Sequence, residues 1–137
     1  MKPPSDTELR ESLRAAGLSV SAQRLAIARY LFGGADHPTA QQVYDNMLEI
    51  LGACSRATVY NTLGAFVEAG LIVEVRSSQD DAVRYDPNTE AHHHLRDRKT
   101  GRLIDIPYDE IQIANLEALK ERFKVDRISI TIDGEAR

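Results

Sequence analysis

The chain contains little sulfur, few aromatic residues and no long apolar run. Cys54 is the only cysteine among 137 residues, which excludes an intrachain disulfide and a structural zinc site built from cysteine pairs. Tryptophan is absent, and aromatic residues make up 6% of the chain. No apolar run approaches the roughly 18 residues of a membrane-spanning helix, and no signal peptide is recognisable. We therefore expect a cytoplasmic protein that has no membrane partner.

Positive charge is also scarce. The 17 lysines and arginines are outnumbered by 21 aspartates and glutamates, which gives a formal net charge of −4. Such a chain has no general attraction to nucleic acid, so any DNA binding must depend on local basic positions helped by bound cations. The remaining composition, 42% hydrophobic and 28% charged, is that of a globular protein.

The N-terminal half shows the apolar spacing of four helices. Ser21, Thr39 and Ser55 are candidate N-caps, and Thr39 with Gln42 has the pattern of a capping box. Glycines after the apolar stripes predict where the helices end, with the fourth helix over residues 56–69. The residues predicted to face inward from the third helix are Val43, Tyr44, Met47, Leu48 and Leu51.

A β-hairpin is predicted directly after the fourth helix. Its strands are Leu71–Arg76 and Ala82–Asp86, joined by a polar turn at Ser77–Asp81. Helix, tight turn, helix and hairpin together make a winged helix-turn-helix. We therefore predict that residues 1–86 form a DNA-binding domain.

The rest of the chain predicts a small α/β domain. Residues 87–90 form a Pro-Asn-Thr-Glu hinge, and residues 91–137 contain a strand hairpin, a helix and a last strand. This part is too short to fold well alone, so we expect it to be a dimerisation domain and the whole chain to be α+β. Asp109 with Gln112 predicts the start of its helix, which carries Ile113, Leu116, Leu119, Lys120 and Phe123. The last strand alternates, with Ile128, Ile130 and Ile132 on one face.

The fourth helix has side chains suited to reading DNA. Arg56, Tyr60 and Asn61 lie on the face opposite the apolar stripe, near the N-terminus that enters the major groove in helix-turn-helix proteins. Arginine pairs with guanine, asparagine pairs with adenine, and tyrosine contacts thymine methyl groups. A solvated helix face is the alternative. The further DNA-binding candidates are Thr58 on the same helix, and Arg76 and Arg84, which flank the tip of the wing.

Three consecutive histidines indicate a metal site. Side chains alternate along a strand, so His92 and His94 share one face and His93 points to the other. A turn at Arg98–Gly101 places Asp105 of the returning strand opposite His94, with Cβ atoms about 5 Å apart. Two imidazoles and a carboxylate then converge. The alternative is a polar strand edge without a ligand.

Four segments together resemble the ferric uptake regulator (Fur) family over nearly the whole chain. They are His37–Ala40, Ser55–Leu63, Glu68–Ile72, and Arg84–Asp86 followed by His92–His94. Members of this family are dimeric, metal-dependent repressors with an N-terminal winged helix and a C-terminal α/β dimerisation domain. The resemblance therefore implies a homodimer that binds pseudo-palindromic operator DNA and is not an enzyme.

Within the family, the chain resembles the peroxide-sensing (PerR) branch most. That branch binds its regulatory metal through positions that correspond here to His37, Asp86, His92, His94 and Asp105. Iron-uptake members usually have glutamate at the two aspartate positions. Nitrogen and oxygen ligands without sulfur suit Fe²⁺ or Mn²⁺ and tolerate Zn²⁺ in purified protein. The resemblance further implies that peroxide oxidises His37 or His92 when Fe²⁺ is bound.

The chain also departs from the family pattern. The Cys-x-x-Cys pairs that hold a structural zinc are absent, Gln112 stands where an accessory metal site would need a carboxylate, and Asn61 replaces a frequent arginine. His93 completes a triple-histidine motif that resembles the haem-linked (Irr) regulators, which leaves an iron- or haem-responsive regulator as an alternative. A small non-haem metalloenzyme is the alternative from another class, because two histidines and a carboxylate also ligate catalytic iron.

Overall fold

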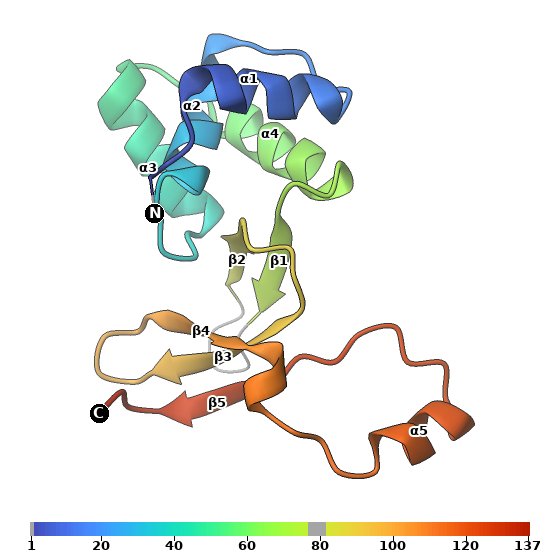
Figure 1. The fold of residues 1–137 in the computed structure, drawn as a ribbon. Coiled ribbons are helices and arrows are strands. Elements are labelled where there is room, and N and C mark those ends of the chain that lie inside the picture. The colour runs from blue at the N-terminus through green and yellow to red at the C-terminus, as the bar shows by residue number, and fades with distance from the viewer. Residues whose placement is uncertain (1, 77–81) are drawn as a thin grey trace. The chain divides into compact units, whose positions relative to one another are not determined.

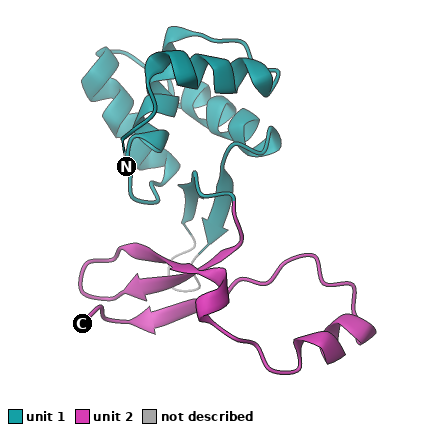
Figure 2. Cartoon of the chain, in the orientation of Figure 1, with its two compact units in different colours: residues 1–89 teal, residues 90–137 magenta. Residues whose placement is uncertain are grey.

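The computed structural model describes residues 2–76 and 82–137, so the wing turn predicted at Ser77–Asp81 lies outside the described residues. The chain divides into two compact units, Met1–Thr89 and Glu90–Arg137 (Figure 2). The division falls inside the segment that the sequence indicates as a hinge.

The first unit contains four helices followed by a two-stranded hairpin (Figure 1). In chain order these are α1 (Asp6–Ala15), α2 (Ala22–Phe32), α3 (Ala40–Leu51), α4 (Arg56–Glu68), β1 (Val73–Arg76) and β2 (Val83–Asp86). The strands β1 and β2 pair antiparallel. This is the winged helix-turn-helix that the sequence predicts.

The apolar stripes of the four helices meet in one core. Ile27 and Leu31 of α2, Met47 of α3, and Leu63 and Phe66 of α4 are completely buried. The sequence places one core residue wrongly. Leu51 at the end of α3 is 37% exposed, because the chain leaves the helix at Gly52, which has the left-handed φ of 76° that glycine tolerates.

Local side-chain hydrogen bonds begin these helices where the sequence predicts them. The hydroxyls of Ser21, Thr39 and Ser55 each accept a hydrogen bond from the backbone N–H three residues later. Thr39 and Gln42 form the complete capping box, since the Gln42 side chain also accepts from the Thr39 N–H at 2.9 Å. The start of α3 is therefore fixed immediately after the loop that contains His37.

The second unit is built on a three-stranded sheet in the order β4-β3-β5. The central strand β3 (His92–Asp97) pairs antiparallel with β4 (Leu103–Pro107) and parallel with β5 (Thr131–Gly134). A 3₁₀ turn η1 (Tyr108–Glu110) and a short helix α5 (Leu116–Arg122) lie between β4 and β5 in the chain. Of the last strand predicted from the isoleucine alternation, only residues 131–134 pair as β5, and Ile132 is 42% exposed.

The prediction that a helix starts at Asp109 is wrong, because α5 begins at Leu116. After η1 the backbone is extended at Ile111, and Asn115 adopts a left-handed conformation with φ 63° before α5 begins. Phe123 follows the helix and is 55% exposed. No residue of α5 is buried, so the packing that usually stabilises a helix does not hold the predicted first turns, and a capping pattern alone is too weak.

None of the helices in the described part of the chain is both long enough and apolar enough to span a membrane.

Candidate metal centre

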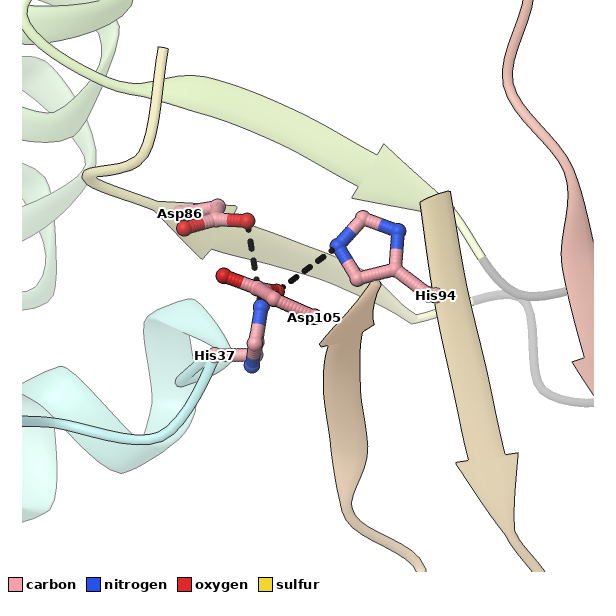
Figure 3. Close-up of side chains that lie close together, drawn as sticks. All are labelled: His37, Asp86, His94 and Asp105. Carbon is pink, nitrogen blue, oxygen red and sulfur yellow. Dashed lines mark hydrogen bonds and ion pairs between the residues drawn. The ribbon is translucent and has the colours of Figure 1, made fainter. Parts of the chain in front are cut away.

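The second unit brings two histidines and one aspartate together on one face of its sheet. His94 pairs with Asp105 in the register of β3 and β4, as the turn predicts. Asp105 Oδ1 lies 3.3 Å from His94 Nε2 and 3.6 Å from His92 Nε2, and the two imidazole Nε2 atoms are 3.1 Å apart. The His94–Asp105 contact is drawn in Figure 3. The three candidate ligand atoms that the strand geometry predicts therefore lie close together.

His93 points to the opposite face and is completely buried. Its Nδ1 accepts a hydrogen bond of 3.0 Å from the Ile130 N–H. The ring stacks on Tyr108 at 4.9 Å between centroids. Because Ile130 directly precedes β5, this contact extends the β3–β5 pairing, and the middle histidine is accounted for as a packing residue of the sheet.

The first unit brings His37 and Asp86 together. His37 belongs to the loop before α3, and Asp86 is the last residue of β2. His37 Nε2 lies 3.1 Å from Asp86 Oδ2 (Figure 3), and the two residues are only 8% and 2% exposed. Their side chains are far apart in the sequence, and neither has a motif of its own that indicates this contact.

The loop that contains His37 is bound to the wing strand. The Tyr85 N–H donates to the Pro38 carbonyl at 2.9 Å, and Arg84 Nη1 donates to the His37 carbonyl at 3.2 Å. Burial raises the pKa of the Tyr85 hydroxyl above its usual range. The structure thus places Arg84, a candidate for phosphate contact, against the His37 loop.

The donor atoms of these residues fit a divalent transition metal. Three imidazoles and two carboxylates provide nitrogen and oxygen ligands without a thiolate, the set that accepts Fe²⁺, Mn²⁺ or Zn²⁺. Within each unit an imidazole nitrogen already lies within hydrogen-bond distance of a carboxylate oxygen, and four of the five side chains are buried to more than nine-tenths of their surface. Within the first unit, a bound cation would compensate the negative charge of Asp86, which is 2% exposed.

The candidate DNA-reading residues lie on the outer face of α4 or in its cap. Tyr60 is 52% exposed, and Arg56 and Asn61 are also exposed. The Thr58 hydroxyl lies 2.8 Å from Ser55 Oγ in the cap of the helix. Arg56 is held by α3, because its guanidinium hydrogen-bonds to Gln41 and lies 4.4 Å above the Tyr44 ring. Arg76 at the end of β1 is exposed.

A winged helix together with a second unit that gathers histidine and aspartate defines a class: the metal-responsive DNA-binding regulators. The comparisons agree with this class. The model of the Ferric uptake regulator family matches residues 15–133, and the chain belongs to this family. It is therefore a transcriptional regulator and not an enzyme.

Relatives and solved structures are similar over most of the chain. The peroxide-responsive repressor PerR of Staphylococcus epidermidis is 38% identical over 109 residues, which cover 77% of this chain and 72% of that protein. A zinc-bound manganese uptake regulator is 30% identical with a TM-score of 0.69, covering 94% of this chain and 98% of the other. The ferric uptake regulator of Pseudomonas aeruginosa with manganese is 29% identical with a TM-score of 0.69, covering 93% and 97%.

Proposed function

We propose that this protein is a homodimeric repressor that binds operator DNA when Fe²⁺ or Mn²⁺ is bound, and that it senses peroxide through bound Fe²⁺. The observation that carries the proposal is the division of the five donor residues between the units. His37 and Asp86 belong to the winged helix, whereas His92, His94 and Asp105 belong to the sheet unit. One ion bound by both sets would hold the two units in a single arrangement.

Such an ion would couple metal binding to DNA binding. In a homodimer, the relative arrangement of the two units sets the distance between the two copies of α4, and this distance must match the two halves of a pseudo-palindromic operator. The metal shifts the equilibrium only by the difference in its affinity for the DNA-binding and other arrangements, which is typically about 1–3 kcal/mol. The residues of this chain supply that difference by ligating from both units.

Two observations support peroxide as the signal. The relative named above is a peroxide-responsive repressor, and both acidic donors, Asp86 and Asp105, are aspartates, as in the branch that the sequence resembles. Bound Fe²⁺ would supply the redox chemistry. In the net reaction, hydrogen peroxide gives one oxygen atom to a ring C–H bond of histidine and leaves as water. The oxidised imidazole is a poorer ligand, so the coupling to DNA is lost.

Selection of DNA sequences tests the proposed function directly. Full-length protein with Mn²⁺ is expected to enrich a pseudo-palindromic sequence from a pool of random duplexes, and a chelator is expected to release the selected duplex in a gel-shift assay. Mn²⁺ is used because it is stable in air. Failure to enrich any sequence, or binding that persists fully after chelation, would refute a metal-dependent repressor.

The readout by α4 is tested on the selected duplex. Arg56→Ala is expected to weaken binding by about 1–3 kcal/mol and to relax the preference for one base pair, because a bidentate contact to guanine is removed. Lys99→Ala, in the exposed turn between β3 and β4, is the control and is expected to leave affinity unchanged. An Arg56→Ala protein with the affinity and preference of the original would place base recognition elsewhere.

A further inference from the structure

His37 has an unusual backbone conformation for a ligand residue. Its φ is 46°, in the left-handed region that residues with a Cβ atom rarely occupy. A conformation of this kind persists only when surrounding contacts hold it, and such positions concentrate at functional sites. The contacts around His37 therefore show which residues determine how its imidazole is presented.

Hydrogen bonds to the backbone and to the ring hold His37 in this conformation. Arg84 and Tyr85 of β2 bind the carbonyls of His37 and Pro38, which fix the backbone of the loop. The ring is bound at both nitrogens: Nε2 lies 3.1 Å from Asp86 Oδ2, and Nδ1 lies 3.2 Å from Asp36 Oδ1. Asp36 therefore contacts Nδ1, whereas Asp86 contacts Nε2 on the other side of the ring.

We propose that Asp36 is a positioning residue of the metal centre, which makes Nε2 the ligand atom of His37. A carboxylate that accepts the Nδ1–H fixes both the tautomer and the ring orientation, and leaves the Nε2 lone pair for the metal. The same contact makes the imidazole a stronger ligand. This inference rests on the proposed function, since it assumes that His37 ligates the metal.

The location of Asp36 explains why its effect is on ligation rather than on folding. The Asp36 side chain is 39% exposed, whereas that of His37 is 9% exposed. An exposed carboxylate bound to a neighbouring residue contributes little to global stability. Its orientation of a buried ring can still change metal affinity strongly, because outer-shell partners of ligating histidines typically contribute about 10–100-fold.

The test is a Mn²⁺ titration of the full-length protein in which electron paramagnetic resonance measures the concentration of the free ion. Asp36→Ala is expected to weaken Mn²⁺ binding by about 10–100-fold, and Asp36→Asn, which keeps an acceptor oxygen without the charge, is expected to fall between. His37→Ala is the reference for loss of the ligand. Asp126→Ala, an exposed aspartate of the second unit, is the matched control with unchanged affinity.

A second readout separates positioning from a structural role. The visible absorption of the Co²⁺-saturated protein reports ligand geometry, and it is expected to shift in Asp36→Ala while the melting temperature of the metal-free protein stays the same. If Asp36→Ala does not fold, the isosteric Asp36→Asn replaces it in both measurements.

The Asp36 and His37 variants distinguish a failure of the Asp36 role from a failure of the proposed function. If His37→Ala loses Mn²⁺ affinity while Asp36→Ala and Asp36→Asn both bind and absorb like the original protein, Asp36 has no positioning role and the proposed function remains. If His37→Ala binds Mn²⁺ like the original, the ligand assignment itself fails, and the inference fails with it.

Discussion

A His92→Ala variant is expected to lose the metal dependence of operator binding. His92 Nε2 lies 3.1 Å from His94 Nε2 and 3.6 Å from Asp105 Oδ1, so its removal takes one of three converging donors from the sheet unit. We expect Mn²⁺ affinity to fall by more than the roughly 100-fold that an outer-shell residue contributes. The stimulation of DNA binding by Mn²⁺, about 5–150-fold for a typical coupling free energy, should then disappear.

The measurement is a gel-shift titration on the selected operator at increasing Mn²⁺. The variant should bind DNA weakly at every metal concentration, whereas Lys99→Ala should respond like the original protein. Circular dichroism checks that the variant is folded. We expect it to fold because His92 is the first residue of β3 and the rest of the strand is unchanged. Operator binding by His92→Ala that still rises with Mn²⁺ as in the original protein would remove His92 from the ligand set.

Peroxide is expected to add one oxygen atom to His37 or His92 in the iron-loaded protein and to release it from the operator. The resemblance to peroxide sensors singles out these two histidines, of which His37 belongs to the first unit and His92 to the second. Because each of the two belongs to a different set of donors, oxidation of either removes one of the contacts through which the metal would join the units.

Mass spectrometry of proteolytic peptides measures the added oxygen, and a gel-shift assay on the same sample measures DNA release. The Zn²⁺-loaded protein is the matched control, because Zn²⁺ occupies nitrogen and oxygen ligands without redox chemistry. After the same treatment, the mass of its peptides should be unchanged and the protein should stay bound to the operator. Iron-loaded protein that releases DNA without oxygen on any histidine would contradict this sensing mechanism, and the regulator would then respond to metal itself.

Residues close together in the sequence allowed several features to be predicted. The caps at Ser21, Thr39 and Ser55 depend on a hydrogen bond that spans three residues, so the sequence pattern is sufficient. The same holds for the contact between His94 and Asp105. A short turn sets the register of an antiparallel pair, and the register then determines which side chains are opposite.

Other features depend on residues that the sequence does not connect. The parallel β3–β5 pairing joins strands that β4, η1 and α5 separate in the chain. The adjoining hydrogen bond from Ile130 to His93 explains a histidine that the pattern left without a role. The Gln41 and Tyr44 contacts of Arg56 also come from a different helix. No local periodicity indicates such contacts.

The sequence by itself determined the four helices of the winged helix, the β3–β4 register and the histidine pair, because each follows from hydrogen bonds or side-chain alternation over a few residues. The family resemblance assigned His37 and Asp86 to one metal site. Only the tertiary structure decided that their side chains contact each other, that Asp36 binds the other side of the His37 ring, and where α5 begins. The physical reason is the same in each case. These features depend on the burial and packing of segments distant in the chain, which outweigh or supplement the weak local preferences of a loop or a helix end.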